Sequence, residues 1–540
     1  MPVHGPQSCS SPTFSSRRPA RSRRACWFGH EFVGAAQLVA AAVLAAGPLA
    51  AARQAGAAVP QEPPNAIDQE AEARGQAVRL LSIEDALRIG RSGNVPLRAA
   101  ELLPEQARTD LLFAEAAFAP ELYVNGNYSD SRAPQRNAFQ PSVQRTTIDG
   151  AMGWRQRTIT GGAFDLAFRP ARIEARGSPA FPAKLHTAEW GATFRQPLLR
   201  GGWTEYNLAA STSAQLGMVQ AEQDFQRTVQ DTLMRIVQAY WELAFSRANW
   251  RVVDAALAVA QEQLRITDER IKVQALAPRD RIADEAELAR RREERIAAEN
   301  DIRAREDELR RLLFDATDPE LWRINLRPSS EIAIEPKAEA RDFAPLVQIA
   351  VQKRPDLDSL RTQISAAEVA LAQAQNETLP RFDFVGGWSS DAARTEFRDT
   401  WNDAIDNTYP DWNVGFEFAL PLGNRAAQAR QLRAMLDLEQ RRRRLHAAVL
   451  DVTKEVRDAV RSLDSLAQSI AAGEVSVRLA TANLETEQVK LRVGASTAFE
   501  VQRRNQELRE ARTRLLRNQL DYRVAESRLL HAQGLLAAPQ

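Results

Sequence analysis

The sequence contains very little cysteine. Its 540 residues include two cysteines, Cys9 and Cys26, and both precede the apolar segment of residues 32–46. Because we expect that part of the chain to be removed, the mature protein would carry no thiol and no disulfide, which fits an exported protein held together by other contacts. Neither cysteine follows the apolar segment, where a lipid-bearing cysteine would have to lie, so we predict no N-terminal lipid anchor.

Histidine is scarce as well, and so are the patterns of catalytic sites. Beyond the presequence the histidines are His186, His446 and His531, which are far apart and lack the spacing of metal ligands. No nucleophile elbow or phosphate-binding loop is present, and the glycine pairs at residues 161–162 and 201–202 fit turns. We therefore predict no enzymatic activity, no metal and no cofactor.

An excess of one charge is also missing. Lys and Arg together number 71 and Asp and Glu together number 70, so the net charge gives no sign of a nucleic-acid partner. The basic run at residues 441–444 lies within a long helical pattern, where we interpret it as a solvated face or as contacts to neighbouring acids. We predict no nucleic-acid binding.

The N-terminus has the features of a secretion signal. Several arginines precede the apolar segment, which is too short to span a bilayer as a helix, and the small residues 49–52 follow it. These arginines are Arg17, Arg18, Arg21, Arg23 and Arg24. We predict a signal peptide over residues 1–52 and a flexible, proline-containing leader over residues 53–81. The alternative is an uncleaved anchor or a disordered tail.

The sequence pattern of the mature chain is present twice. Four landmarks recur at one constant offset: Pro120, Gly126, Tyr128 and Ser129 return as Pro380, Gly386, Trp388 and Ser389. Two apolar stripes with a spacing of seven recur at a second constant offset, and they imply left-handed supercoiling of long helices. The stripes are Val229, Ile236, Leu243, Trp250, Leu257, Leu264 and Ile271, and Val449, Val456, Leu463, Ile470, Val477, Leu484 and Leu491. The chain is therefore predicted to be a tandem repeat.

Each predicted repeat consists of a helical lead-in, a β insert and a long helical hairpin. Repeat 1 spans residues 82–314, with the insert at about 121–200 and the hairpin at 203–314. Repeat 2 spans residues 346–536, with the insert at about 381–422 and the hairpin at 425–536, and residues 315–345 form a linker between the repeats. Ser82 fits the N-cap of the first helix, which we expect to continue beyond Pro96 to Phe113.

The first β insert is longer than the second. We expect strands at residues 121–128, 147–156, 163–169 and 189–196 in the first insert, and at 381–389 and 412–420 in the second. Residues 160–162 would form the hairpin turn between the second and third strands.

The aromatic residues of the inserts indicate a membrane barrel. We predict that they form its interfacial girdle. They are Tyr123, Tyr128, Trp154, Trp190, Trp388 and Trp412. One chain has too few strands to close a barrel, and an open edge is excluded from hydrocarbon, so several chains would share one barrel. The alternatives are a soluble β-sandwich for the inserts and, for the stripes, an ordinary coiled-coil rod, as in a structural or adhesive surface protein.

Together these features resemble the TolC-like outer-membrane efflux proteins. The resemblance extends from Ser82 to Leu536 and includes the duplicated unit, the segment at residues 196–201 that leads from the β insert into the long helix, and the turn at residues 493–501. It implies an α+β membrane protein: a homotrimeric outer-membrane β-barrel of twelve strands, four from each chain, continuous with an antiparallel α-helical coiled-coil tunnel in the periplasm.

The resemblance also implies that the linker at residues 315–345 is part of an equatorial segment, and it implies a function. It predicts a passive duct of a tripartite efflux or type I secretion system, located in the outer membrane and extending into the periplasm. The partners would be a periplasmic adaptor, or membrane fusion, protein, an inner-membrane pump and the lipid of the outer membrane. Because repeat 2 lacks a counterpart of the extra hairpin at residues 147–169, we expect this hairpin to project from the barrel as a flap and not to widen it.

The periplasmic tip is where we expect the mechanism to reside. The repeat offset pairs Asp280 and Arg281 with residues 500–501, so each hairpin turn carries one carboxylate, although a solvated acid at a helix start is an equal explanation. The candidate tip residues are Asp280, Arg281, Gly494, Ser496, Glu500 and Arg503. Glu500 and Arg503 are three residues apart on one helix face, where they could form a local ion pair or contact Asp280 and Arg281 of the neighbouring hairpin. The resemblance implies a gating tyrosine and arginine, and this sequence has Leu491 and Ser496 there.

Overall fold

The computed structural model describes residues 78–537, apart from 134–142, 177–183, 275, 316, 318, 331–333 and 335–341. The predicted signal peptide and most of the predicted leader lie outside these residues. The end of the predicted leader is a strand, because β1 (Val78–Leu81) pairs in parallel with β6 (Asn325–Pro328). The small sheet thus joins the start of the described chain to the segment between the repeats. The short helix η2 (Pro319–Arg323) precedes β6.

The helical lead-in is broken into three helices. These are α2 (Ile83–Gly93), α3 (Val95–Ala100) and α4 (Leu102–Glu115), followed by the short η1 (Ala116–Phe118). Ser82 caps α2 as predicted, since its hydroxyl accepts a hydrogen bond from the Asp85 backbone N–H at 3.1 Å. The predicted single helix is wrong at Asn94: this residue precedes Pro96 closely, has extended backbone angles, and caps α3 through the Leu97 N–H.

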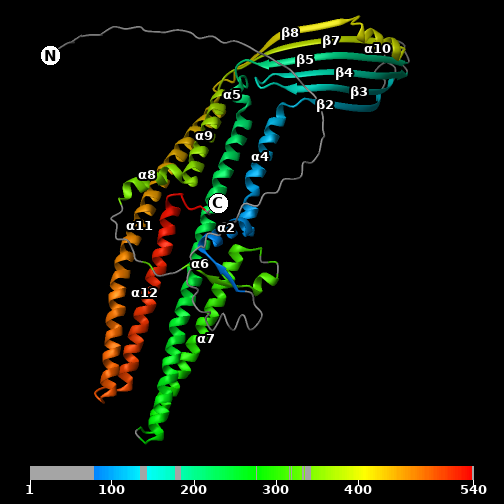
Figure 1. Cartoon of the computed structure of the whole chain (residues 1–540). Helices are drawn as coiled ribbons and strands as arrows, with labels where there is room; N and C mark the ends of the chain where they lie inside the picture. The colour runs from blue at the N-terminus through cyan, green and yellow to red at the C-terminus, as the bar shows by residue number, and fades with distance from the viewer. Residues whose placement is uncertain are drawn as a thin grey trace, which may run out of the picture. The chain divides into compact units, whose positions relative to one another are not determined.

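Two long helical hairpins follow the β inserts. Their first helices contain 64 and 68 residues, which corresponds to a length of roughly 100 Å each. The hairpin of repeat 1 consists of α6 (Ala209–Lys272) and α7 (Asp280–Leu313), preceded by the short α5 (Thr204–Asn207), and that of repeat 2 consists of α11 (Arg425–Arg492) and α12 (Ala498–Ala532). The helical lead-in of repeat 2 consists of α8 (Phe343–Lys353) and α9 (Pro355–Asn376). Figure 1 shows α6 beside α7 and α11 beside α12.

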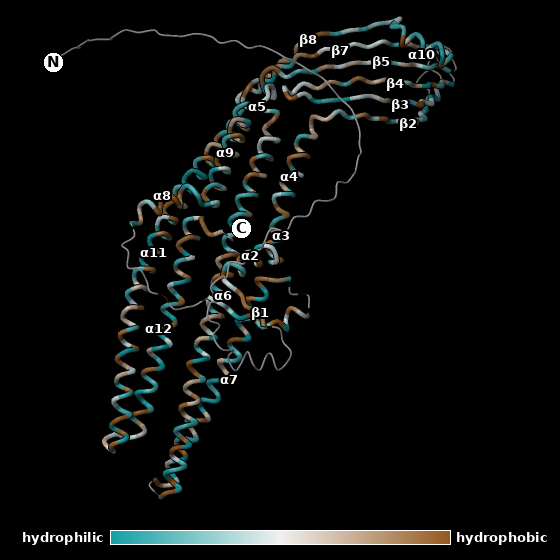
Figure 2. The backbone as a smooth tube through the Cα atoms, viewed as in Figure 1, coloured by the Kyte–Doolittle hydropathy of each residue, from teal (hydrophilic) through white to brown (hydrophobic). Residues whose placement is uncertain are grey.

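The predicted stripes form the core of these hairpins. The side chains at nine of the fourteen positions are buried, and those at the others are half-buried. The buried ones are Val229, Ile236, Leu243, Trp250, Leu257, Val456, Leu463, Ile470 and Leu484. Figure 2 shows apolar and polar residues alternating closely along each helix, as the stripes require. None of the described helices combines the length and apolarity needed to cross a membrane.

All strands of the two β inserts belong to one antiparallel sheet. Its order is β2 (Glu121–Ala133), β3 (Val143–Arg157), β4 (Ala163–Arg176), β5 (Lys184–Pro197), β7 (Arg381–Arg394) and β8 (Pro410–Ala419). The expected strands are confirmed, with longer bounds than predicted. Figure 1 shows the six strands side by side at the end of the helices that is opposite to the hairpin turns.

The sheet corrects two expectations. The sheet of this chain has six strands, whereas the resemblance implied four for each chain. The predicted flap is wrong too, because β3 and β4 lie inside the sheet and pair along their lengths with β2 and β5. The hairpin has no counterpart in repeat 2, but its alternating side chains continue both faces of the sheet.

The two faces of the sheet differ in chemistry. One face is apolar, and a row of paired residues on it runs Leu122, Trp154, Leu166, Ala192, Trp388 and Trp412. The short helix α10 (Phe397–Ile405), between β7 and β8, packs on this face, with Trp401 against Phe168 at a ring separation of 4.7 Å. The opposite face is polar and rich in ion pairs, such as Glu121–Arg155 at 2.8 Å.

Candidate functional site

The two hairpin turns form the free tip of the helices. Gly494 ends the α11 turn with φ of 76°, a left-handed conformation that favours glycine, and nothing surrounds the position of its missing Cβ. Gln274 takes the corresponding conformation after α6, with φ of 59°. Thr497 caps α12 by accepting a hydrogen bond from the Glu500 backbone N–H at 3.4 Å. Thr497 was missed in the sequence, although Thr followed three residues later by Glu is a capping-box pattern.

Ser496 holds an acid of the preceding helix. Its hydroxyl donates to the Glu487 carboxylate at 2.5 Å, and the Lys490 ammonium lies 3.4 Å from the same carboxylate. The hydrogen bond from Ser496, and then the contact with Lys490, hold the pKa of Glu487 below its usual value. Glu487 was not predicted, and its spacing to Lys490 was the available signal.

Arg281 ties the two helices of the first hairpin together. Its guanidinium lies 2.9 Å from the carboxylate of Glu285, on the same helix, and 3.4 Å from that of Asp268 on α6. The backbone of Asp280 begins α7, and its side chain lies outside the described part of the structure.

Of the contacts that the sequence allowed for Arg503, the local pair with Glu500 is not formed within the described residues. Arg503 instead lies 3.4 Å from Glu507, one turn further along α12, and Arg504 donates to the same carboxylate at 2.8 Å. Glu507 lies four residues after Arg503 and three residues after Arg504, so both arginines can reach it. This contact competes with a pair between Arg503 and the preceding Glu500.

A buried carboxylate links the two hairpins just above the tip. Asp284 of α7 accepts a hydrogen bond from the hydroxyl of Thr267 on α6 at 2.6 Å and from the side-chain amide of Gln502 on α12 at 3.3 Å. Further from the tip, Glu294 of α7 lies 3.3 Å from the guanidinium of Arg509 on α12. A cavity of about 130 Å³ lies between α6, α7 and α12 in this region. We call the three residues Thr267, Asp284 and Gln502 the tip link.

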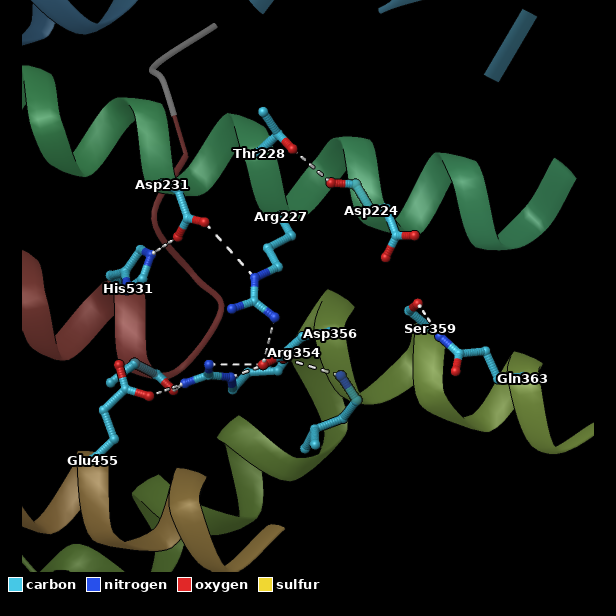
Figure 3. A network of polar contacts seen from close by, with 12 residues as sticks. Asp224, Arg227, Thr228, Asp231, Arg354, Asp356, Ser359, Gln363, Glu455 and His531 are labelled. Carbon is cyan, nitrogen blue, oxygen red and sulfur yellow. Dashed lines mark hydrogen bonds and ion pairs between the residues drawn. The ribbon is translucent and has the colours of Figure 1, made fainter. Parts of the chain in front are cut away.

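A second polar cluster joins four helices nearer the sheet, and Figure 3 shows it. We call it the helix clamp. It consists of Arg227 and Asp231 of α6, Arg354 at the start of α9, Asp356 of α9, Glu455 of α11 and His531 of α12.

Arg354 is the centre of the helix clamp. Its guanidinium donates two hydrogen bonds to Asp356, at 3.0 and 2.9 Å, and a third to Glu455 at 2.6 Å. It also donates to the backbone carbonyl of Ala532 at 3.2 Å, which fixes the end of α12. This fork geometry is one that lysine does not provide. The helix clamp therefore joins α6 of the first hairpin, through Arg227 and Asp231, to α9, α11 and α12 of the second repeat.

The helix clamp changes the acidity of two carboxyl groups. Burial raises the pKa of Asp356, but the hydrogen bond and charge of Arg354 outweigh it and hold the pKa below its usual value. The hydrogen bond with His531, together with the charge of Arg227, outweighs burial and likewise lowers the pKa of Asp231. The stabilisation by both groups is present above their unfolded-state value of 3.8 and is lost as the pH falls through the lower folded-state values.

We expect the replacement Asp356→Asn to lower the melting temperature at pH 7, and the difference from the wild type to shrink as the pH falls below about 4. The physical reason is that protonation of Asp356 removes the same charge that the mutation removes. Thermal unfolding followed by circular dichroism at several pH values measures this. Asp358→Asn, on the same helix, is the matched control, because Asp358 pairs with the half-exposed Arg361. A difference that stays constant from pH 7 to pH 3 would contradict the assignment.

The predicted aromatic girdle residues occupy both faces of the sheet. Five of them lie on the apolar face: Tyr128, Trp154, Trp190, Trp388 and Trp412. Tyr123 does not belong to the set, because it lies on the polar face and its hydroxyl donates to Asp165 at 3.1 Å. Tyr123 and Tyr128 are five residues apart, so the alternation of a strand puts them on opposite faces.

The basic run of α11 makes local contacts. Arg441, Arg442 and Arg443 lie 2.8 to 2.9 Å from carboxylates of Asp437, Glu368 and Glu439. Within the described part of the chain, no group of three or more His, Cys, Asp or Glu side chains is arranged to hold a metal ion.

Comparison with known proteins identifies relatives of both the sequence and the fold. Residues 346–535 match the family described as "Outer membrane efflux protein". The chain is 24% identical over 360 residues to the outer membrane protein TolC of Vibrio cholerae, which covers 64% of this chain and 76% of that protein.

The solved structures that the chain resembles are outer-membrane channels. The CmeC outer membrane channel of Campylobacter jejuni superposes with a TM-score of 0.63 at 14% identity, over 85% of this chain and 87% of CmeC. The outer membrane protein VceC of Vibrio cholerae superposes with a TM-score of 0.62 at 18% identity, over 84% of this chain and 96% of VceC. At these identities the superpositions establish a shared fold for most of the chain.

Proposed function

We propose that this chain, which belongs to the outer membrane efflux protein family, is one third of a homotrimeric duct that a periplasmic adaptor protein connects to an inner-membrane pump. As a member of that family it is an efflux channel of the outer membrane, with its helices extending into the periplasm. The sheets of three copies would close into a transmembrane barrel, and the helical hairpins would form a tunnel below it.

The two-faced sheet is the observation that carries the proposal. Its apolar face suits contact with lipid, and its polar face suits a water-filled lumen. Its two outermost strands, β2 and β8, each have one edge that pairs with no other strand of the described chain. Unpaired edges are excluded from hydrocarbon, so copies of the chain must pair edge to edge. A surface adhesin built as a coiled-coil rod would leave the apolar face unexplained.

The sheet also has the stagger that a closed barrel needs. One row of paired residues begins with Leu122, near the helix-side end of β2, and ends with Trp412, near the opposite end of β8. The row therefore climbs across the wall as it passes from strand to strand, which is the geometry of tilted barrel strands.

The tip supports a docking role for the hairpin turns. Large apolar side chains there are more than two-thirds exposed in the single chain, and they surround both turns. They are Val273, Ile282, Val493 and Phe499. Exposed apolar groups of this kind mark protein contacts, and the adaptor is the partner that we propose for them. The duct itself would be passive, with energy and selection of the cargo supplied by the pump.

Membrane fractionation and an unheated gel test the proposed function. The account predicts an outer-membrane protein that migrates as a trimer before heating and as a monomer of 60 kDa or less, after removal of the signal, once heated. Recovery of the chain as a soluble elongated rod would contradict the barrel and support the surface coiled-coil alternative.

The tip link is expected to keep the tunnel closed in the absence of partners. Asp284→Ala removes the carboxylate that holds Thr267 and Gln502, so we expect a larger single-channel conductance in planar bilayers, with the trimer retained. Glu285→Ala is the matched control, because the neighbouring Glu285 binds Arg281 at the surface of its own helix. Equal conductance of the two variants would mean that the tip link does not hold the closed state.

The acids of the hairpin turns are expected to bind multivalent cations. Asp280 and Glu500 lie in the first turns of the two return helices, and three copies would repeat them around the aperture. Changing both to alanine should reduce the block of the channel by multivalent cations. If bilayer recordings show the same block in the double variant, these carboxylates are only solvated helix ends.

A further inference from the structure

We propose that the β3–β4 hairpin widens the barrel, so that three copies with six strands each close an outer-membrane barrel of eighteen strands. The inference rests on the homotrimer of the proposed function. The partner at each open edge would be a second copy of this chain, with β8 of one copy beside β2 of the next.

The strands of the β3–β4 hairpin are integral strands of the sheet. β3 pairs with β2 from Glu121↔Arg155 to Ala133↔Val143, and β4 pairs with β5 over twelve successive positions. On the polar face Tyr123 of β2 donates to Asp165 of β4 across β3. On the apolar face the rings of Trp154 and Phe164 lie 5.3 Å apart. Both faces thus continue through the hairpin without a break.

The tandem repeat identifies the hairpin as an insertion. The constant offset makes β2 the counterpart of β7, and the prolines at the ends of the inserts, Pro197 and Pro421, make β5 the counterpart of β8. In repeat 2 the two counterparts are neighbours, while in repeat 1 the β3–β4 hairpin lies between them. Because an antiparallel hairpin adds two strands, β2 and β5 keep opposite directions with or without it.

The same equivalence predicts how two copies pair. Within one chain β5, the last strand of repeat 1, pairs with β7, the first strand of repeat 2. Their counterparts are the two open edges, β8 and β2. Arg195 of β5 pairs with Val385 of β7. The repeat makes Ala419 the counterpart of Arg195 and Asn125 the counterpart of Val385, so we expect Ala419 to pair with Asn125 of a second copy. Ala419 and Asn125 lie on the polar face of their own strands, so this register joins polar face to polar face.

A barrel of eighteen strands has a much wider lumen than one built from four strands per copy. Because the diameter grows roughly linearly with the number of strands, it would be about 1.5 times larger and the cross-section about twice as large. Barrels of this size leave an aqueous channel. The narrow part of the duct would then lie in the helices, and the barrel would admit any cargo that passes them.

Electron cryo-microscopy of the wild-type trimer in lipid nanodiscs tests the inference directly. We expect eighteen strands in the barrel wall. The deletion of residues 143–176 joins β2 to β5 at the end of the sheet that is far from the helices, as β7 joins β8, and we expect it to give a trimer with twelve strands. A wild-type wall of twelve strands, with β3 and β4 outside it, overturns the inference and leaves the proposed function standing. Absence of a trimer from the wild type overturns both.

Cysteine variants test the wall without any deletion. The two native cysteines lie in the predicted signal peptide, so a new thiol is easily followed. In outer-membrane vesicles, Ala151→Cys, on the polar face of β3, should react with a water-soluble thiol reagent, and the neighbouring Met152→Cys, on the apolar face, should be protected by lipid. Equal reaction of both would show that β3 projects into water, which overturns the inference.

A cross-link tests the edge pairing between copies. The double variant Asn125→Cys and Ala419→Cys should form disulfides that give covalent dimers and trimers on a reducing-agent-free gel, because paired residues lie within disulfide reach. Asn125→Cys with Gly415→Cys, which keeps the same face but shifts the register, is the matched control. Stronger cross-linking of the control overturns the predicted register.

Discussion

Replacement of Ile470 by aspartate is expected to abolish the trimer. Ile470 is fully buried in α11 and packs in a cluster with Leu463 and Tyr522. An unpaired carboxylate at this position would be separated from water by two packed helices, at a cost of several kcal/mol in each chain, and the three copies of the trimer would each carry the defect.

The trimer yield on an unheated gel measures this effect. Gln468→Asp is the matched control, since Gln468 lies on the same helix, is exposed in the single chain, and acquires the same charge. If Ile470→Asp gave as much trimer as Gln468→Asp, the helix packing described above would be wrong.

A large loss of stability is also expected when Glu306 is removed. Glu306 of α7 is buried between two buried arginines, with its oxygens 2.7 Å from the guanidinium of Arg247 and 3.0 Å from that of Arg310. Arg247 also donates to the side-chain oxygen of Asn325 in β6, so the group connects the first hairpin to the small parallel sheet. Glu306→Ala would leave two buried positive charges without their shared carboxylate, which typically destabilises a protein by about 3–5 kcal/mol.

Thermal unfolding of the purified protein, and the temperature at which the trimer dissociates on a gel, measure the effect of Glu306→Ala. Glu308→Ala is the control, because Glu308 forms an exposed pair with Arg311 on the same helix, and such pairs contribute about 1 kcal/mol or less. Equal melting temperatures of the two variants would show that the buried cluster contributes no more than a surface pair.

The helices and their core could be predicted from the sequence because the signal is local and repeated. Positions such as Ile236 and Leu463 recur with the period of a supercoiled helix, and this period fixes which side of the helix is buried. Ser82 could be identified as a cap for the same reason, since its partner lies three residues away. The repeat then extended each conclusion from one half of the chain to the other.

The strand pairing could be predicted only in part. The alternation of residues located each strand, but the partner of a strand is not encoded within it, so the absence of a counterpart in repeat 2 led to the incorrect flap. The face on which a side chain lies could be predicted, because side chains alternate between the two faces along a strand. Tyr123 is an odd number of residues from Tyr128, so its position on the polar face follows from this alternation. The side chains of β3 alternate between the two faces as those of β2 do. This alternation could have predicted that the hairpin belongs to the sheet.

The contacts of the tip could not be predicted, because they depend on which of several nearby charges a side chain meets. Arg503 has acids at Glu500 and Glu507 within reach along its helix, and the structure selects Glu507. The tip link joins residues from three helices that are far apart in the sequence, with Asp284 and Gln502 separated by most of repeat 2. Only the packing of the two hairpins brings them together.

Single-channel recording tests the central claim, that copies of this chain close into an outer-membrane duct. Wild-type protein extracted from the outer membrane as a trimer and added to one side of a planar bilayer should insert and produce discrete, uniform conductance steps. The Ile470→Asp preparation, handled identically, should produce none. Trimeric Asp284→Ala protein, in which the tip link is removed, should give conductance steps as well. If it binds the bilayer in a Ca²⁺-free solution without any conductance step, the claim is contradicted.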